Sequence, residues 1–229
     1  MAEKLPTVVL LASFAAVILS LAAPLLAGDP DMLQDICVAD YKSLQGPLRV
    51  NGFPCKPEAN VTAEDFFFPG LGKPADVYSG NPMGSAVTAA TVERIPGLNT
   101  LGVSMARVDY APWGGANPPH SHPRATEILF VADGLLEVGF VIGSRLITRV
   151  VPKGGVFVFP RGLLHYERSV GEKPAVAISA FDSQLPGTQA VGDALFGSSS
   201  PAVPTDVLAR AFQVDGGVVE NIKSKFQHK

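Results

Sequence analysis

Between residues 85 and 181, short apolar runs alternate with turn residues, and this pattern limits the possible fold more than any other feature of the sequence. Six runs of four to eight residues are rich in Val, Ile and Phe: 101–108, 127–131, 135–142, 146–151, 156–159 and 175–181. Runs of this length between Gly and Pro turns are typical of β-strands in a sandwich or barrel. Asp133-Gly134 separates two of the runs and predicts a hairpin turn. The sequence therefore predicts an all-β fold.

The C-terminal part of the chain has a different, helical pattern. Thr205 is a candidate N-cap for a helix that runs through Phe212. After Gly216-Gly217, apolar residues recur at helical spacing, at Val218, Val219, Ile222 and Phe226. We therefore expect a helical C-terminal region at about 201–227. Its apolar faces fit two roles equally well, covering the barrel or contacting another subunit.

Length and composition fit one domain. The chain has 229 residues, near the upper end for a single domain, and 47% of them are hydrophobic, enough for a sizeable core. We expect this domain to span 29–229, with an extended arm at 29–84, the barrel at about 85–182 and the helical region after it. The arm is rich in Pro, Gly and Asn and is predicted to contain short strands. The net charge of −3, without a basic cluster, argues against a nucleic-acid partner.

Residues 1–28 have the layout of a secretory signal peptide. Lys4 supplies a positive charge, an apolar run extends from Val8 to Leu26, and small residues precede the acidic Asp29-Pro30-Asp31. The alternative is an uncleaved signal anchor, because about 20 apolar residues can span a bilayer. Pro24 and the small residues favour cleavage. Since no later apolar run is long enough to span, we expect a secreted mature chain without membrane contact.

The two cysteines of the chain, Cys37 and Cys55, lie just after this segment. In an oxidising compartment an isolated pair 18 positions apart should form a disulfide, and closing a loop of this size contributes about 3 kcal/mol. The alternative is that both are metal ligands, although no Cys or His nearby completes such a site. Asn60-Val61-Thr62 is the one N-x-S/T sequon without a blocking proline, so we expect a glycan on Asn60 in a surface loop.

Three of the four histidines and one glutamate fall in two compact motifs. The first contains His120-Ser121-His122 and, further on, Glu127. Alternate residues of a strand point to the same face, so both imidazoles can reach one ion. Pro123 should bend the chain after them. Glu127 opens the next apolar run, where a buried carboxylate is tolerated if it binds a cation.

The second motif is Pro160-Arg161-Gly162, followed by His165. A tight turn at Gly162 places His165 at the start of a further strand, and antiparallel strands can bring it beside the first motif. Three neutral imidazoles and one carboxylate make a ligand set of charge −1. Nitrogen and oxygen donors without sulfur suit Mn, Fe, Ni, Cu or Zn. Four protein ligands on an octahedral ion leave two open positions, which fits a catalytic site.

At these residues the sequence resembles the germins and germin-like proteins of plants, within the cupin superfamily. The first motif reads Gly114, five residues, His120-Ser121-His122, four residues, Glu127, six residues, Gly134. The second reads Gly154, five residues, Pro160-Arg161-Gly162, two residues, His165. The resemblance covers essentially the whole mature chain, from Pro30-Asp31-Met32-Leu33-Gln34 to Lys225-Phe226.

The resemblance implies a cupin jelly-roll β-barrel that binds Mn(II) through His120, His122, Glu127 and His165. It also implies the disulfide between the two cysteines, an apoplastic location, and a hexamer built as a trimer of dimers whose C-terminal helices clasp neighbouring subunits. One departure is Ser169, which stands where the second motif often has Asn. That residue is not a ligand, so we expect a changed contact near the metal rather than a loss of metal binding.

Germins proper are oxalate oxidases, and their pocket includes two Asn side chains that hydrogen-bond the substrate. One of them matches Asn117 here, but the other falls at Ala106, which has no amide. Losing a hydrogen bond to a charged group costs about 1.5–3 kcal/mol, so oxalate oxidase is the weaker prediction. Many germin-like proteins are credited with superoxide dismutase activity. That reaction needs open coordination and a proton source, but no protein nucleophile.

We therefore expect a secreted manganese protein that dismutates superoxide and produces hydrogen peroxide in the cell wall. A role in plant defence is implied by the family alone. Besides oxalate oxidase, two alternatives stay open. The metal can simply brace a wall-associated binding or receptor-like protein, or the site can serve nucleotide-sugar or phosphodiester hydrolysis, as in some relatives.

Overall fold

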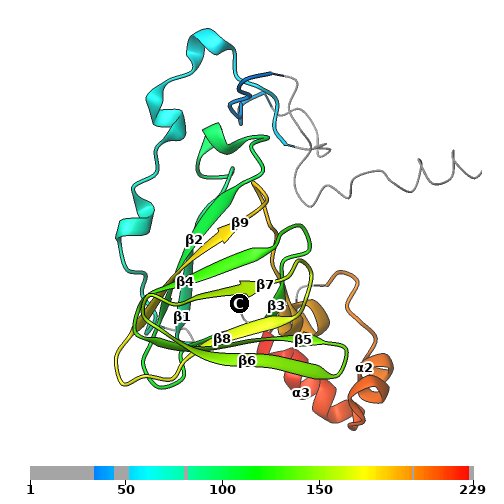
Figure 1. Ribbon diagram of the computed structural model, residues 1–229. Helices are drawn as coiled ribbons and strands as arrows, with labels where there is room; N and C mark the ends of the chain where they lie inside the picture. The colour runs from blue at the N-terminus through cyan, green and yellow to red at the C-terminus, as the bar shows by residue number, and fades with distance from the viewer. Residues whose placement is uncertain (1–33, 44–51, 80–81, 198, 227–229) are drawn as a thin grey trace, which may run out of the picture.

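The computed structural model describes residues 34–43, 52–79, 82–197 and 199–226. The predicted signal peptide, residues 1–28, lies outside these ranges. Within them the chain forms two five-stranded antiparallel sheets that face each other, with helices beside them (Figure 1). This is the all-β architecture that the apolar runs predict. No helix in the described ranges is long and apolar enough to cross a membrane.

The first sheet has the strand order β1-β2-β9-β4-β7, and the second has the order β10-β3-β8-β5-β6. The strands of the first sheet are Ser85–Ala90 (β1), Ser104–Tyr110 (β2), Ala175–Phe181 (β9), Glu127–Asp133 (β4) and Val156–Phe159 (β7). Those of the second are Gln189–Ala190 (β10), Ala116–Ser121 (β3), His165–Ser169 (β8), Leu135–Ile142 (β5) and Arg145–Pro152 (β6). Each of the six predicted runs therefore contributes a strand, although β2 begins at Ser104 rather than at residue 101.

Side chains from both sheets fill the space between them. In β4, Leu129 and Val131 point inward and are fully buried, whereas Ile128 and Phe130 at the alternate positions are exposed. The buried apolar cluster around the first two also contains Val108, Tyr110, Leu136, Val138, Val151, Phe159, Ala175 and Ala177. Burying a Leu or Val side chain fully contributes about 1.5–3 kcal/mol relative to exposure. We call this cluster the apolar core.

The predicted hairpin at Asp133-Gly134 is wrong. The strands on either side, β4 and β5, belong to different sheets, so the turn carries the chain from one sheet to the other. Gly134 has φ +81°, and a Cβ at this position would lie 2.6 Å from the Cβ of Ala175, so only glycine fits. The tight hairpin is at Gly143-Ser144 instead, where Ile142 pairs with Arg145 on either side of the turn.

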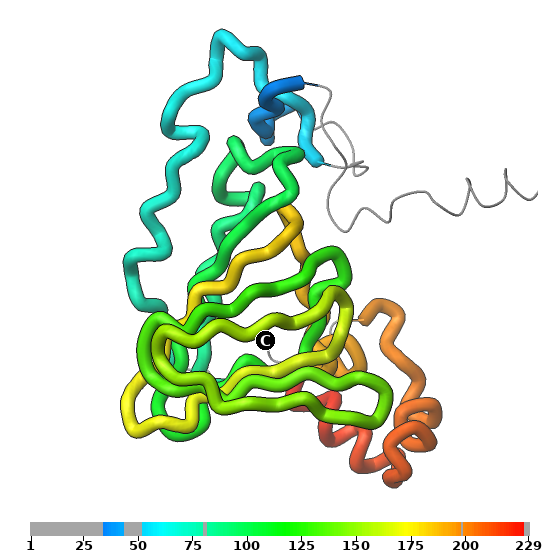
Figure 2. The backbone as a smooth tube through the Cα atoms, viewed as in Figure 1, coloured from blue at the N-terminus to red at the C-terminus, as the bar shows by residue number. Residues whose placement is uncertain are grey.

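The arm that precedes the barrel contains 3-10 turns in place of the predicted short strands. The turns are Glu58–Asn60 (η1), Ala63–Phe66 (η2) and Gly70–Gly72 (η3). In the described part of the arm, β-pairing is limited to one bridge between Ala39 and Cys55. Frequent Pro residues remove the N–H donors that a strand ladder needs. In Figure 2 the arm (cyan) runs along the outside of the barrel, where η3 contacts β1.

Two features fasten the start of the arm. Cys37 and Cys55 form the predicted disulfide, so the alternative in which both are metal ligands is wrong. Asn99, which follows the 3-10 turn Pro96–Leu98 (η4), is fully buried. Its side chain donates to the Phe53 carbonyl and accepts from the Phe53 N–H, both at 2.9 Å. The arm is thus held by one covalent bond and by a pair of buried hydrogen bonds.

The helical region consists of Asp193–Gly197 (η5, a π-helical turn), Thr205–Phe212 (α2) and Gly216–Phe226 (α3). The predicted cap at Thr205 is wrong, because Pro204 holds the cap position and the Thr205 hydroxyl donates to the Glu220 carboxylate of α3. α2 and α3 pack on each other, and α3 packs on η5 through Phe226 and Phe196. The helices therefore lie beside the barrel rather than across a sheet (Figure 1).

Candidate metal centre

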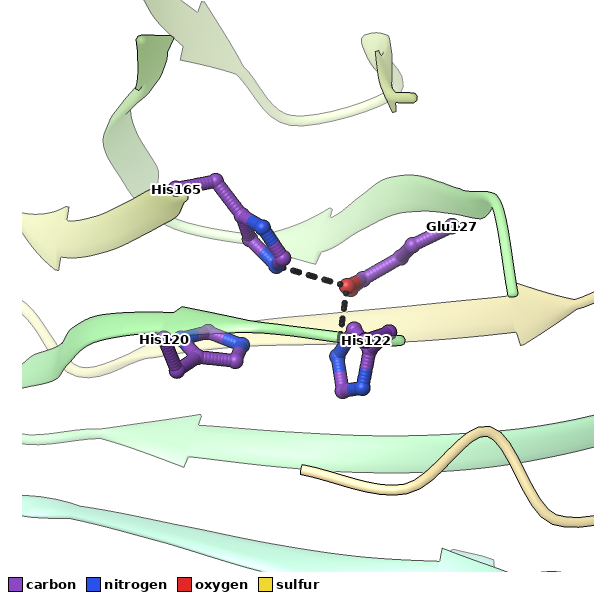
Figure 3. A group of neighbouring side chains, drawn as sticks. All are labelled: His120, His122, Glu127 and His165. Carbon is purple, nitrogen blue, oxygen red and sulfur yellow. Dashed lines mark ion pairs between the residues drawn. The ribbon is translucent and has the colours of Figure 1, made fainter. Parts of the chain in front are cut away.

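The two sequence motifs meet inside the barrel. His120 belongs to β3, His122 directly follows that strand, Glu127 opens β4 and His165 opens β8. His120 and His165 are cross-strand partners in the second sheet, and Glu127 reaches them from the first. All four side chains are buried, and one donor atom of each lies within 4.8 Å of the others (Figure 3). Metal–ligand bonds of about 2.0–2.4 Å place opposite ligands about 4–5 Å apart, so this spread fits a single ion.

An irregularity in β3 precedes the first ligand. Pro118 and Pro119 fall inside this strand, and its pairing with β8 shifts register between Asn117 and His120. Because proline cannot donate a ladder hydrogen bond, it is found in strands at edges and bulges. The bulge re-aims the side chains that follow it, which is a common device beside functional sites.

Two turns complete the placement of the ligands. β3 ends at Ser121, and the chain bends at Pro123 as predicted. Gly162, with φ +75°, makes the turn that delivers His165 to the start of β8. The N–H of Gly162 donates to the carbonyl of His122 at 3.0 Å, so the two motifs are also tied directly through their backbones.

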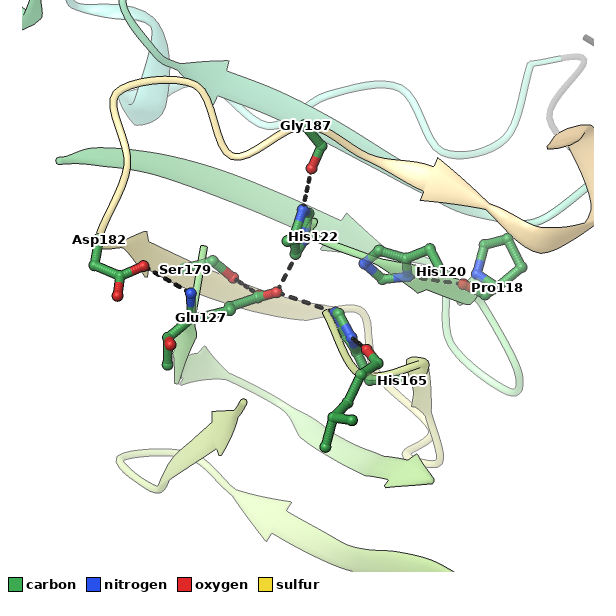
Figure 4. A network of polar contacts seen from close by, with 10 residues as sticks. Pro118, His120, His122, Glu127, His165, Ser179, Asp182 and Gly187 are labelled. Carbon is green, nitrogen blue, oxygen red and sulfur yellow. Dashed lines mark hydrogen bonds and ion pairs between the residues drawn. The ribbon is translucent and has the colours of Figure 1, made fainter. Parts of the chain in front are cut away.

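Backbone carbonyls hold each imidazole in one tautomer. His120 and His165 each place Nδ1 2.8 Å from the carbonyl oxygen two residues earlier in the chain. The Nδ1 of His122 is hydrogen-bonded to the carbonyl of Gly187 (Figure 4). A carbonyl oxygen can only accept, so all three Nδ1 atoms carry a proton. In the neutral imidazoles the Nε2 lone pairs are therefore free, and this arrangement is usual for metal-binding histidines.

Glu127 brings the negative charge of the cluster. Its Oε2 lies 3.1 Å from Nε2 of His122 and 3.3 Å from Nε2 of His165. Its Oε1 accepts a hydrogen bond of 2.5 Å from the Ser179 hydroxyl. Burial raises the pKa of Glu127, but the contacts with the two imidazoles, which require a proton or a cation between Nε2 and Oε2, and the hydrogen bond from Ser179 outweigh burial and lower that pKa to about 2. The carboxylate is therefore ionised at neutral pH.

The cluster is electrostatically incomplete without a cation. Burial, together with the neighbouring His165, lowers the pKa of His120 to about 4, so this imidazole is neutral at pH 7. Oε2 of Glu127 and Nε2 of His165 are buried without a hydrogen-bond partner. Facing lone pairs repel unless a proton or a metal ion lies between them, and an unpaired buried charge is costly. The donor set therefore fits a divalent metal ion.

Aromatic rings keep this site apolar on two sides. The ring of Phe159 stacks on His165 with centroids 4.4 Å apart and planes 20° apart. The ring of Phe181 meets His122 edge-on at 4.9 Å. Excluding water in this way strengthens the electrostatic interaction of the ligands with an ion.

Sequence reasoning did not find three residues that support the ligands (Figure 4). Ser179 binds the Glu127 carboxylate, and Gly187 accepts from His122. Asp182 accepts from the N–H of Thr126 at 2.7 Å and so holds the backbone just before Glu127. Ser179 had a detectable signal, since it is the polar residue at an inward position of an apolar run. The carbonyl of Gly187 acts through the backbone, which has no signal in a sequence.

Glu167 is a further buried carboxyl group that the sequence analysis did not single out. It follows His165 on the inward face of β8 and is almost fully buried. Burial raises its pKa well above the usual value, and the charge of Glu127 adds to this, whereas the neighbouring Asn117 side chain opposes it. Glu167 therefore holds its proton more tightly than an exposed carboxyl group does. Ser169, the noted departure from the motif, is the next inward residue, and its hydroxyl has no hydrogen-bond partner among the described residues.

The two predicted pocket positions lie on different walls of the barrel. Asn117 is on β3, half-buried, and pairs across the strands with Glu167. Ala106 is on β2 and is buried against Ala125 and Phe181. It also lines a cleft that reaches the His122 ring. The wall at position 106 is therefore apolar, as the sequence indicates.

Comparison with known proteins places this fold and site in a family. The family profile described as "Cupin" matches residues 70–220. Germin-like protein 1-4 of Oryza sativa subsp. japonica is 95% identical over 235 aligned positions, which cover all of both chains. The chain belongs to the germin-like proteins of the cupin family. The predicted membership and the predicted cupin barrel are thus confirmed, and in this germin-like protein the three histidines and Glu127 form a metal-binding site.

More distant members support the same assignment. Germin-like protein subfamily 2 member 4 of Arabidopsis thaliana is 58% identical over 214 residues, which cover 93% of this chain and 94% of the relative. A solved structure of recombinant oxalate oxidase in complex with glycolate is 48% identical, with a TM-score of 0.80, and the match covers 86% of this germin-like chain and 98% of the oxalate oxidase. The cupin barrel of this chain is therefore close to one that holds a small organic acid.

Proposed function

We propose that this germin-like protein is a secreted manganese-dependent superoxide dismutase that produces hydrogen peroxide in the cell wall. The reaction converts two superoxide ions and two protons into one oxygen and one hydrogen peroxide molecule. The observation that carries the proposal is the convergence of three imidazoles and one carboxylate within 4.8 Å. A bound manganese ion would supply the change between two oxidation states that the reaction needs.

The residues around the site fit this chemistry. The carbonyl partners of the three Nδ1 atoms fix the imidazole rings, and Ser179 fixes Glu127, so the ligand set is preorganised. Nitrogen and oxygen donors without sulfur suit manganese. The reaction requires no protein nucleophile, and both cysteines are already paired in the disulfide.

Loss of superoxide is the direct test. The protein loaded with Mn(II) should remove superoxide catalytically, and His122→Ala should abolish this activity together with metal binding. His228→Ala is the matched control, because His228 is the one histidine of the sequence outside the two motifs, and the variant should behave as the parent. Full metal occupancy without superoxide loss would refute the proposal. Elemental analysis of protein from its native source would identify the metal.

Oxalate oxidase is the second candidate, because a solved oxalate oxidase matches this chain at 48% identity and because Asn117 is present. Ala106 weakens it, since its methyl group cannot hydrogen-bond a carboxylate. Oxalate-dependent formation of hydrogen peroxide by the same preparation would favour this activity. Full metal occupancy without either activity would favour a wall-associated binding role in which the metal braces the barrel.

Secretion is supported by two features of the arm. A disulfide persists in oxidising compartments, which the extracellular space provides. Asn60 of the sequon lies in η1 with its side chain exposed, where a glycan can be accommodated. A secreted chain should lack residues 1–28, and N-glycosidase should lower its mass. An unchanged mass after glycosidase treatment would contradict glycosylation at Asn60.

Assembly into a homo-oligomer, as a hexamer, is supported by exposed apolar side chains on one sheet. On the outer face of β4 and β7, Ile128 pairs with Val158 and Phe130 pairs with Val156, and all four are 43–57% exposed. Contiguous exposed apolar patches mark interaction surfaces. Light scattering should give the mass of six chains. The mass of one chain at micromolar concentration would contradict the proposal.

A further inference from the structure

A cleft beside the metal site, which Ala106 lines, has no role in the proposed superoxide chemistry. It has a volume of about 280 Å³ and lies between β1, β2 and the segment 185–188. The ring of His122 forms part of its wall, as do Ala106 and Phe181. Figure 4 shows the Gly187 end of this segment lying against His122. The cleft is therefore separated from the metal position by one ligand side chain.

We propose that this cleft binds an uncharged compound of one aromatic ring that bears a hydroxyl group, in the chemical class of phenol. The size of the cleft is the first argument. Pockets for drug-sized ligands have volumes of about 300–1,000 Å³, so a cleft just below that range suits a single ring. This inference does not depend on which reaction the metal supports.

The lining of the cleft is the second argument. Most of it is apolar and includes Ala89, Met105, Ala106, Phe181 and Leu185. Ala106 and Phe181 are themselves buried, so the deep end of the cleft is both apolar and well packed. An aromatic ring placed there gains the burial of its apolar surface and an edge or face contact with Phe181.

The charge of the lining is the third argument. Glu93 is the one acidic residue in the wall, and neither Lys nor Arg lines the cleft. The nearby cation, Arg124, lies behind the segment 185–188 and donates to the Leu185 carbonyl at 2.8 Å, so it is not part of the wall. A carboxylate ligand would therefore meet the charge of Glu93 first, whereas a hydroxyl group can donate a hydrogen bond to Glu93. Thr91 and Thr188 add hydroxyl groups to the same wall. The cleft therefore favours a neutral hydroxyl-bearing ring over an anionic one.

Phenol and benzoate are matched probes for this inference, because the two rings are similar in size and differ in charge. With the full chain loaded with Mn(II), we expect the relaxation of phenol ring protons to be enhanced by the nearby paramagnetic ion, with phenol binding at least about 10-fold tighter than benzoate. Glu93→Gln removes the negative charge from the wall, so the difference in affinity between phenol and benzoate should become smaller. Equal or tighter binding of benzoate, or no enhancement for phenol, would overturn the proposal.

Filling the cleft provides the decisive variant. Ala89 is exposed, so Ala89→Phe should occupy the cleft without disturbing the core, keep its metal and bind phenol at least about 10-fold more weakly. Ala202→Phe makes the same change at an exposed position outside the cleft and should bind phenol as the parent does. Equal weakening in both variants would contradict the assignment. If phenol fails to bind and Ala89→Phe dissociates an oligomer, a second copy of the chain fills the cleft instead.

Discussion

The ligand cluster and the apolar core occupy the same barrel but are stabilised in opposite ways. Along the inward face of β4, Glu127 is followed by Leu129 and Val131, so one strand contributes to both regions. The core residues need only each other, because burying apolar surface is favourable in any close-packed arrangement. The ligands instead bring facing lone pairs and a carboxylate together, which is favourable only around a cation. Folding and metal binding should therefore be separable by substitutions two residues apart.

The largest effect on stability should come from the apolar core. Leu129→Ala removes a fully buried side chain and should lower the free energy of unfolding by about 2–5 kcal/mol. Metal stoichiometry should stay unchanged in the protein that remains folded. Urea denaturation and elemental analysis measure the two quantities. Leu146→Ala is the matched control, because this leucine is half exposed in β6, and its effect should be below about 1 kcal/mol.

Glu127→Gln should instead act mainly on metal binding. The amide keeps the size of the side chain but removes the charge, so metal affinity should fall at least about 100-fold, equivalent to about 2.7 kcal/mol. The metal-free protein should still fold, because the amide keeps the shape of the side chain and its oxygen can still accept the hydrogen bond from Ser179. Calorimetric metal titration and urea denaturation test both parts. Unchanged metal affinity would remove Glu127 from the ligand set.

Lowering the pH should destabilise the metal-free protein through the ligand cluster. The pKa of His120 is about 4 in the folded protein and about 6.5 when unfolded, so the unfolded chain takes up this proton first as the pH falls. The contribution of the neutral His120 ring to the free energy of unfolding is therefore fully present above pH 6.5. As the pH falls towards 4, the free energy of unfolding should decline, by about 2 kcal/mol at pH 5. Urea denaturation at pH 7.5 and 5 measures the decline, and His120→Gln should flatten it. An equal decline in both proteins would assign the effect to other groups.

The smallest expected effect comes from Ser179, whose hydroxyl supports the Glu127 ligand. Ser179→Ala removes the hydrogen bond to Oε1 of Glu127 but leaves every ligand in place, so metal affinity should fall about 10-fold. Ser144→Ala, in the exposed turn between β5 and β6, should leave affinity unchanged. A metal titration of both variants decides whether this hydrogen bond orients the carboxylate.

The same contrast explains which features were predictable from sequence. Local patterns were sufficient for the strands, because the alternation of Ile128, Leu129 and Phe130 depends only on neighbouring residues. The ligands were predictable because the spacing of His120 and His122 encodes a shared strand face, and because their motif resembles that of a known family. Each of these two signals, the strand alternation and the motif spacing, is contained within a few consecutive residues.

Features that depend on distant segments were missed. Asp133-Gly134 has hairpin chemistry, but the pairing of β4 with β9 and of β5 with β8 assigns the two strands to different sheets. Thr205 has the side chain of a cap, but Glu220 in the next helix binds its hydroxyl. The carbonyl of Gly187, which fixes the tautomer of His122, belongs to a segment 65 residues away. Sequence patterns indicate which groups are available, and tertiary contacts decide which of them are used.

The most direct test of the account is the metal content of the folded chain. Elemental analysis of the purified full-length protein should find one transition-metal ion per chain. The double variant His120→Ala with His165→Ala should contain none while it remains folded by circular dichroism. A folded parent protein that binds no metal after exposure to Mn(II), Fe(II), Ni(II), Cu(II) and Zn(II), or a double variant that keeps its ion, would contradict the central claim.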